Sequence, residues 1–285
     1  MTSFGTLYLV ATPIGNLEDI SRRALRILNE VDLIAAEDTR HTLKLLNHFE
    51  IRKPLVSYHQ HNERERSQEI IGRIETGTSV ALVSDAGMPG ISDPGGQLVA
   101  DAIQRGIQVV PIPGPSAIIT ALAASGLDTG SFLFEGFLPR QNKEQLKRLG
   151  ELKAFRGTLG FYEAPHRLTH TLKNIATVFG ERRVVLAREL TKLHEEFIRG
   201  MISDVIQKIT EQETRGEFTI LVEGEREPDV FRQDSTNYDF NHLFDTMEAS
   251  DRSLKEKLKE IAKATGRSAR EVYGMYLDYR GESKK

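Results

Sequence analysis

Short apolar runs alternate with amphipathic stretches along most of the chain. The amphipathic stretches repeat apolar residues every three or four positions, as helices do, for example at Ala24, Ile27 and Leu28. The apolar runs carry few polar residues, as strands covered on both faces should. We expect strands at residues 6–11, 33–36, 55–58, 80–83, 109–112, 158–161, 184–187 and 218–222. The alternation predicts an α/β fold with parallel strands.

Three glycine- and proline-rich turns follow predicted strands, at residues 12–16, 84–95 and 113–116. Ligands of open α/β sheets bind at the carboxyl ends of strands, so we expect these turns to share one edge. None contains G-x-G-x-x-G or a P-loop, which argues against a polyphosphate ligand. The turns offer backbone groups, carboxylates and hydroxyls, which suit a ligand with hydrogen-bonding edges and little phosphate. S-adenosylmethionine has that character.

Length and composition narrow the classes of protein. A chain of 285 residues predicts two compact units with room for a smaller third. The absence of cysteine excludes a disulfide framework, a thiolate zinc site, an iron–sulfur cluster and a cysteine nucleophile. The start of the chain has no basic leader, and its apolar run is far shorter than the about 20 residues of a membrane span. We expect a cytoplasmic protein with no membrane contact.

Charge separates the C-terminal end from the rest. Residues 224–253 are polar and acid-rich, which indicates a linker. Residues 251–285 hold ten lysines and arginines against six aspartates and glutamates, a net charge of +4, whereas the rest of the chain carries −7. Capping-box patterns begin at Ser253 and Ser268, and Gly266 marks a stop between them, so we expect a small helix-turn-helix.

The basic C-terminal helices have two interpretations. Most such faces are solvated surface and bind nothing specific. Here the charge reverses relative to the body, and the two predicted helices meet at a tight glycine turn. We therefore predict that nucleic-acid phosphates are held by Lys255, Lys259, Lys263, Arg267 and Arg270, and the family resemblance described below implies that the nucleic acid is RNA.

Structural roles compete with functional ones at several polar residues. Asp93 precedes Pro94 and a predicted helix, so helix capping is its first interpretation, and Ser116 has the same alternative. For the run at residues 37–40, the favoured interpretation is that Asp38 or Thr39 caps the next helix, and the second is contact with the substrate. His166 and His170 have the spacing of one helical face but not the H-E-x-x-H pattern, so we expect no metal site.

Seven motifs in order carry a resemblance to a known family: ATPIGNLEDIS, AAEDTRHT, SYHQHNE, VSDAGMPGISDPG, GFLPR, FYEAPHRL and ARELTKLHEE. The first, the fourth and the segment PIPGPSA resemble loops of the tetrapyrrole (corrin/porphyrin) methylase superfamily. The whole series is similar to the branch that methylates the 2′-hydroxyl of a cytidine in 16S ribosomal RNA. The similarity runs from about residue 5 to residue 224, and the C-terminal helices are similar to the appendage of that branch.

The resemblance implies two consecutive α/β domains of the tetrapyrrole methylase type and a small C-terminal helical module. We assign them residues 1–118, 119–228 and 229–285. S-adenosylmethionine is expected between the first two, the substrate is expected to be 16S ribosomal RNA or the small ribosomal subunit, and a homodimer is expected. The implied cofactor residues are Pro13, Asp85, Ala86, Gly87, Met88, Pro89, Gly90, Ile91, Ser92, Asp93, Ser116, Ala117, Tyr162, Ala187, Glu217, Phe218 and Thr219.

Methyl transfer to a ribose also needs a group that accepts the hydroxyl proton. Candidates near predicted strand ends are Glu163, Arg188, Glu189 and His59, with Glu163 first because it follows Tyr162. Two other functions stay open. A methyltransferase for a corrin or porphyrin precursor has no obvious use for a basic appendage, and a non-catalytic ribosome-binding module has no need of three rigid walls around one pocket.

Overall fold

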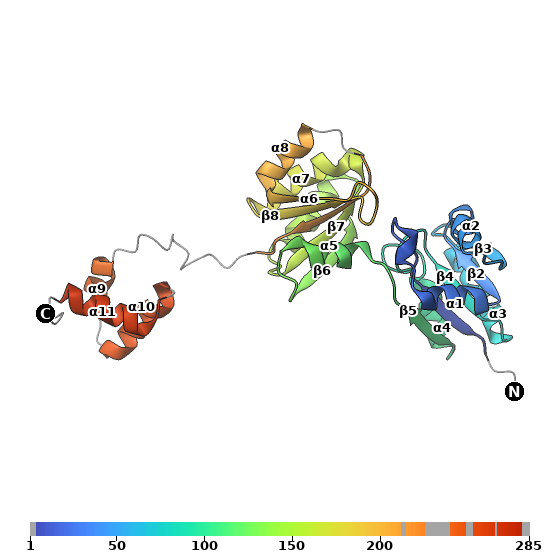
Figure 1. The fold of residues 1–285 in the computed structure, drawn as a ribbon, viewed down its shortest axis with the longest axis horizontal. Helices are drawn as coiled ribbons and strands as arrows, with labels where there is room; N and C mark the ends of the chain where they lie inside the picture. Colours follow the sequence, from blue (N-terminus) through green and yellow to red (C-terminus); the bar gives the residue numbers. More distant parts are fainter. Residues whose placement is uncertain (1–3, 212–214, 226–239, 249–252, 266, 281–285) are drawn as a thin grey trace. The chain divides into compact units, whose positions relative to one another are not determined.

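The structure is a computed structural model that describes residues 4–211, 215–225, 240–248, 253–265 and 267–280. The chain divides into two compact units, Met1–Glu225 and Arg226–Lys285 (Figure 1). The predicted boundary at residue 118 lies inside the first unit and stays a prediction. No helix in the described ranges is long and apolar enough to cross a membrane.

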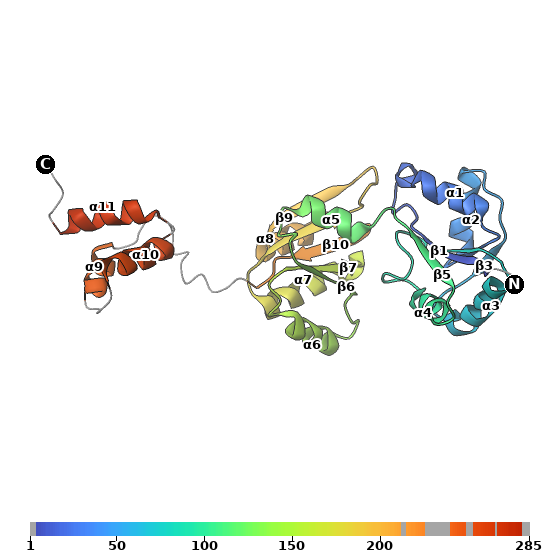
Figure 2. The same cartoon turned by 90° about the horizontal axis from the view of Figure 1, so that it is seen from below.

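The first unit begins with a five-stranded parallel sheet in the order β3-β2-β4-β1-β5. Its apolar side chains pack against two helices on each face, and Figure 2 shows this three-layer arrangement. A 3-10 turn, η1 (Leu17–Asp19), precedes the first helix. The strands are β1 (Thr6–Val10), β2 (Leu33–Ala36), β3 (Leu55–Ser57), β4 (Val80–Val83) and β5 (Gln108–Ile112). The helices are α1 (Arg22–Glu30) and α2 (Thr39–His48) on one face, and α3 (Glu63–Glu75) and α4 (Gly96–Gln104) on the other.

A second sheet of five strands follows, in the order β6-β7-β10-β8-β9. Helix α5 (Ala117–Ser125) covers one face, and three helices cover the other. The strands are β6 (Phe132–Phe137), β7 (Thr158–Glu163), β8 (Arg183–Arg188), β9 (Glu196–Met201) and β10 (Phe218–Val222). The three helices are α6 (Asn142–Leu152), α7 (Pro165–Phe179) and α8 (Ile202–Thr210).

The expectation of parallel strands throughout is wrong for this second sheet. Only β6 and β7 are parallel, whereas β10 runs antiparallel to both of its neighbours and β9 antiparallel to β8. All eight expected strands are present, but β6 and β9 are additional. Both are edge strands, so they are partly exposed and carry polar residues such as Glu135 and Arg199 that interrupt an apolar run.

The second unit is a bundle of three helices: α9 (Phe240–Glu248), α10 (Leu254–Thr265) and α11 (Ala269–Tyr279). Its core contains Phe244, Leu258, Ile261 and Val272. The interpretation of residues 224–253 as a linker is therefore wrong over α9, which has an apolar face of its own. The other linker residues, 226–239 and 249–252, and the predicted stop at Gly266 lie outside the described residues.

The structure decides three of the predicted helix caps. At α11 the capping box is present, with Ser268 and Glu271 each bonding the other's backbone N–H. Asp38 caps α2 by accepting from the N–H of Arg40. The interpretation of Asp93 as a cap is wrong, because α4 has Gly95 as its N-cap, at φ +143°. At that φ, glycine is far less strained than a residue with a side chain.

Candidate active site

The turns that follow β1, β4 and β5 come together at the carboxyl edge of the first sheet. Thr12 and Gly87 exchange backbone hydrogen bonds of 2.9 and 3.1 Å, and the Thr12 hydroxyl donates to the carbonyl of Ser84 at 3.1 Å. Gly114 lies so close to Ala11 that an added Cβ would meet the Ala11 Cβ at 2.9 Å. These contacts fix the three turns to one another, as the strand order predicts.

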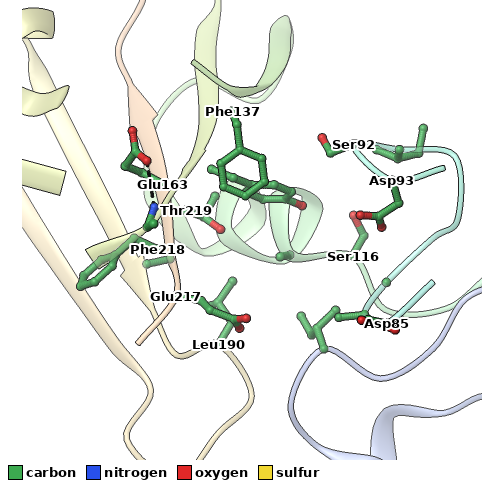
Figure 3. A pocket seen from close by; sticks show the side chains of 18 of the residues that line it. Asp85, Ser92, Asp93, Ser116, Phe137, Glu163, Leu190, Glu217, Phe218 and Thr219 are labelled. Carbon is green, nitrogen blue, oxygen red and sulfur yellow. Dashed lines mark hydrogen bonds between the residues drawn. The ribbon is translucent and has the colours of Figure 1, made fainter. Parts of the chain in front are cut away.

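The turns form one wall of a cavity of about 450 Å³, within the usual range of about 300–1,000 Å³ for small-molecule sites. The second sheet and the segments around it form the opposite wall (Figure 3). The first wall consists of Ile14, Glu37, Asp85, Ala86, Gly87, Met88, Ile91, Ser92, Asp93, Ser116 and Ala117. The second consists of Phe137, Tyr162, Glu163, Ala164, Pro165, Ala187, Leu190, Glu217, Phe218 and Thr219.

Strand register explains why distant residues meet in the second wall. Thr219 on β10 pairs with Tyr162 on β7 and with Ala187 on β8. Paired residues on neighbouring strands point to the same face of a sheet, so these three form one row across the sheet. The positions of these three side chains are therefore fixed by the backbone hydrogen bonds of the sheet and not by the conformation of a loop.

Three carboxylates, Glu37, Asp85 and Asp93, lie on the first wall of the cavity. Burial first, and then the negative charge of Glu37, raise the pKa of Asp93 to about 6. Burial and the charge of Asp85 raise the pKa of Glu37. Asp85 accepts a hydrogen bond from the N–H of Asp38 at 3.1 Å, which holds its side chain between the two turns. The cavity therefore favours a cationic ligand and holds a carboxylate that is poised to exchange a proton near neutral pH.

Most residues that the resemblance implied for the cofactor line this cavity. The exceptions are Pro13, Pro89 and Gly90. Pro13 is buried behind the wall, and its neighbour Ile14 reaches the cavity instead. Ser116 is the N-cap residue of α5, but its side chain makes no capping hydrogen bond. Its hydroxyl is therefore available to a ligand beside the first N–H groups of that helix.

Glu163, the first candidate for the base, lines the cavity with a carboxylate that is already engaged. One oxygen accepts from the Thr171 hydroxyl at 2.6 Å, and the other accepts from the N–H of Ala164 at 2.9 Å. The Arg167 guanidinium lies 3.4 Å away, and the Glu163 side chain is fully buried. Figure 3 shows its carboxylate turned away from Asp85 and Ser116. These contacts give Glu163 the position of a structural residue that anchors α7 to β7.

Arg188, Glu189 and His59 do not line the cavity. Arg188 donates to the carbonyl of Arg215, and Glu189 bonds Lys192 and the N–H of Glu217. A charge interaction with His59 lowers the pKa of Glu37, although the larger effects of burial and Asp85 raise it. The Nδ1 atom of His59 is buried without a hydrogen-bond partner. Of the four candidates, only Glu163 reaches the cavity wall.

Replacing Glu163 by glutamine tests its structural role. We expect Glu163→Gln to lower the free energy of unfolding by about 1–3 kcal/mol, because a buried carboxylate loses charge-assisted hydrogen bonds. For the methyl transfer that the family resemblance predicts, the single-turnover rate at saturating substrate should stay within about threefold of the unaltered protein, because a residue that accepts no proton does not contribute the about 10²- to 10⁴-fold of a general base. Urea unfolding and rapid-quench kinetics measure the two effects. A large loss of rate with unchanged stability would contradict this assignment.

Sequence reasoning missed several cavity residues. The pattern at residues 37–40 predicts helix capping first and substrate contact second, and it does not single out Glu37, although Glu37 directly follows β2 and carboxyl strand ends are where ligands bind. Phe137 was missed because β6 was not expected, and the alternating apolar residues of SFLFEGF are the signal that could have found it. Leu190, Ala164 and Pro165 follow strands β8 and β7.

The predicted RNA-binding residues belong to the separate C-terminal unit. Lys255, Lys259 and Lys263 follow one another every four residues along α10, so they lie on one side of that helix. These three are exposed, as are Arg267 and Arg270. The guanidinium of Arg267 lies over the Phe240 ring, 5.4 Å from its centroid.

Comparison with known sequences gives close relatives over nearly the whole chain. Ribosomal RNA small subunit methyltransferase I of Halalkalibacterium halodurans is 50% identical over 275 residues, which cover 95% of this chain and 94% of the relative. The protein of the same name from Bacillus subtilis is 46% identical and covers 96% of this chain and 95% of its own length. The one from Thermotoga maritima is 49% identical, and 220 aligned residues cover 99% of it but 77% of this chain.

Solved structures share the fold at low sequence identity. A diphthine synthase superposes with a TM-score of 0.60 at 16% identity, covering 77% of this chain and 90% of that one. A Thermus thermophilus uroporphyrin-III C-methyltransferase in complex with S-adenosylhomocysteine superposes with a TM-score of 0.52 at 19% identity. The superposition covers 78% of this chain and 98% of that one. The sequence profile of the Tetrapyrrole (Corrin/Porphyrin) Methylases matches residues 6–206. The chain therefore belongs to the tetrapyrrole methylases and, within them, to the family of the ribosomal RNA small subunit methyltransferases I.

Proposed function

We propose that this protein transfers the methyl group of S-adenosylmethionine to the 2′-hydroxyl of a cytidine ribose in 16S ribosomal RNA. The observation that carries the proposal is the 50% identity to a ribosomal RNA small subunit methyltransferase I over almost the full length of both chains. Action on a corrin or porphyrin precursor is supported only by a shared fold at 19% identity. Shared fold alone does not decide a substrate.

The residues of the cavity fit S-adenosylmethionine. Its sulfonium is a cation, and Glu37, Asp85 and Asp93 give the first wall a negative charge. The N-terminus of α5, with the free Ser116 hydroxyl, suits the carboxylate of the methionine part. The row of Tyr162, Ala187 and Thr219 offers apolar surface and polar groups for the adenosine part.

The bound cofactor supplies an electrophilic methyl group on a positively charged sulfur. When held by the two walls, that methyl group would be open to attack by a ribose oxygen, and the sulfur would keep the electron pair of the carbon–sulfur bond. The hydroxyl proton must go to a base, and we assign this role to Asp93, whose pKa of about 6 suits proton exchange near neutral pH. Positioning by the rigid turns supplies the larger share of the acceleration, of the order of 7–11 kcal/mol.

The carboxylates should also distinguish the cofactor from its product, which differs in lacking the positive charge on sulfur. We expect Asp85→Asn to weaken S-adenosylmethionine about 10-fold and S-adenosylhomocysteine less than about threefold, since one charge–charge contact is worth about 1–2 kcal/mol in a partly solvated site. Calorimetric titration of both ligands measures this. Asp101→Asn is the matched control, because Asp101 lies on α4, does not line the cavity and accepts a hydrogen bond from Gln97. Equal weakening of the two ligands would contradict charge recognition by Asp85.

The substrate is tested by mapping 2′-O-methyl groups in 16S ribosomal RNA from cells with and without this protein. A site that is methylated only when the protein is present supports the proposal. Incubation of the purified protein with labelled S-adenosylmethionine and either small ribosomal subunits or tetrapyrrole precursors separates the two functions. Label on the tetrapyrrole alone would overturn the assignment.

We also propose that the protein acts as a homodimer in the cytoplasm. The proposal follows from the family and from the expected substrate, since ribosomal RNA is modified where ribosomes are assembled. Sedimentation equilibrium at micromolar concentration measures the mass of the assembly, and a monomer at that concentration would contradict the first part. Cell fractionation tests the second part.

A further inference from the structure

Phe137 is an exposed aromatic residue on the cavity wall. It is the last residue of β6, and 57% of its surface is exposed although it lines the cavity. Its ring meets the Tyr162 ring edge to face at 5.7 Å, and Tyr162 meets Phe134 at 4.8 Å. Figure 3 shows the ring of Phe137 between Glu163 and Ser92. An aromatic series therefore runs from the covered face of the second sheet to open solvent at the cavity.

The backbone holds this ring in place. The pairing of β6 with β7 shifts register between Phe134 and Gly136, and Gly136 has φ +75°. An added Cβ at Gly136 would lie 2.7 Å from the Ser92 hydroxyl oxygen, so the strand end packs directly against the turn of the first wall. Ser92 itself has φ +63°. Phe137 is therefore presented by a bulge fixed against the opposite wall, and bulges commonly re-aim side chains beside active sites.

Exposed apolar surface at this cavity needs an explanation. Ile91 of the first wall is 51% exposed, so two large apolar side chains face solvent where the cavity is lined. Exposed apolar side chains that line a cavity suit a ligand with an apolar face. The second-sheet row offers Tyr162, Ala187 and Thr219 to the cofactor, and Phe137 extends it on β6, where it pairs with Tyr162. Phe137 differs from Ala187 and Thr219 in being mostly exposed, so it can contact a second ligand.

The chemistry of the proposed substrate supplies the matching surface. A ribose hydroxyl lies next to its own base, so a 2′-hydroxyl that enters the cavity brings a base to the residues beside it. Enzymes that act on one nucleotide take it out of the stack and hold its base against aromatic or apolar side chains. Every base has a π-face, and unpaired RNA bases commonly stack on phenylalanine or tyrosine.

We propose that Phe137 stacks on the base of the nucleotide to be methylated, with Ile91 as a second apolar surface for it. The inference rests on the proposed function, because it assumes an RNA ribose as methyl acceptor. The protein then requires a target nucleotide that is unpaired or extruded from its helix. Recognition of the base is separate from recognition of RNA phosphates by the C-terminal unit.

The test compares Phe137→Ala, Phe137→Tyr and Phe132→Ala in the full-length protein. Phe132 is the matched control, because it lies on the same strand, is 42% exposed and does not line the cavity. We expect Phe137→Ala to lower kcat/KM for small-subunit RNA by about 5- to 150-fold, the range found for removal of one stacked aromatic. Phe137→Tyr should restore most of the rate, and Phe132→Ala should match the unaltered protein. Because Phe137 also contacts Tyr162, its loss can weaken S-adenosylmethionine, but kcat/KM for RNA should fall at least about fivefold more than the cofactor affinity does.

Each contrary result has its own meaning. If the unaltered protein methylates the RNA and Phe137→Ala does so with the same kcat/KM, stacking is wrong and the proposed function stands. If Phe137→Ala loses cofactor affinity in proportion to its loss of rate, the ring belongs to the cofactor site, and base stacking is again wrong. If the unaltered protein methylates no RNA ribose, the proposed function fails and takes this inference with it.

Discussion

We expect Asp93→Asn to lower the single-turnover rate of methyl transfer by about 10²- to 10⁴-fold, the usual contribution of a positioned base. Asparagine keeps the size of the side chain and removes its capacity to accept a proton. Asp93 lines the cavity, and its carboxylate is partly buried beside Glu37 and Asp85. Rapid-quench measurement with saturating cofactor and RNA isolates the chemical step from binding.

The pH dependence gives a second readout of the same prediction. With a pKa of about 6, Asp93 is protonated and inactive as a base at pH 5 and ionised at pH 7, so the rate of the unaltered protein should rise through about pH 6. The residual rate of Asp93→Asn should not show this rise. A variant that keeps both the rate and the pH profile would remove Asp93 from the mechanism.

Asp93→Asn should lower the rate but raise the stability of the protein. A measured gain in stability would show that the variant is folded. The pKa of Asp93 is raised in the folded protein above its ordinary value of 3.8, so ionisation destabilises the fold as pH rises from about 4 to about 6. Asp93→Asn should therefore melt higher above pH 6 and show no gain below pH 4. After allowance for solvent screening we expect about 1 kcal/mol, or about 2–4 °C in Tm.

We expect replacement of Lys255, Lys259, Lys263, Arg267 and Arg270 by glutamine to weaken RNA binding roughly 10³-fold at 0.15 M salt. Five phosphate contacts release counterions, and their loss should flatten the slope of log affinity against log salt by about 3.5–4.5. Filter binding or anisotropy over a range of salt concentrations measures both quantities. The five side chains are exposed, three on α10, one on α11 and Arg267 between these helices, and none of them belongs to the core of the bundle. Loss of Arg267 also removes its contact with the Phe240 ring.

Two controls separate charge from shape. Arginine at positions 255, 259 and 263 keeps the charge and should keep the affinity and the salt slope. At saturating RNA the glutamine variant should methylate at the normal rate. An unchanged salt slope in the glutamine variant would show that these residues do not bind RNA phosphates.

The sequence predicted the first wall of the site better than the second. Parallel strands deliver their carboxyl ends to one edge, so the turns after β1, β4 and β5 could be placed together from strand order and composition alone. The second wall depends on β10 lying antiparallel between β7 and β8, and a buried apolar strand such as β10 carries no mark of its direction.

Individual side chains show the same limit. Glu163 was the first candidate for the base because it follows Tyr162, but its carboxylate is engaged by Thr171, eight residues further along the chain. Asp93 fits the pattern of a helix cap, yet α4 begins after Gly95 instead. In both cases the decisive contact comes from the packing of elements, which a local pattern does not contain. Phe240 and Phe244 on α9 illustrate a different error. Their spacing of four residues is that of one helical face, but the polar composition of the surrounding stretch predicts a linker instead.

The row of Tyr162, Thr219 and Ala187 has a consequence for how such enzymes diversify. Because backbone pairing fixes the row, a shift of β10 by one residue would turn all of its side chains to the opposite face, and no gradual change can move one member alone. Variation is left to the segments that border the cavity, such as the turns of the first wall, and to appended units. One scaffold can thereby keep a single methyl donor while its acceptors range from macrocycles to nucleic acid.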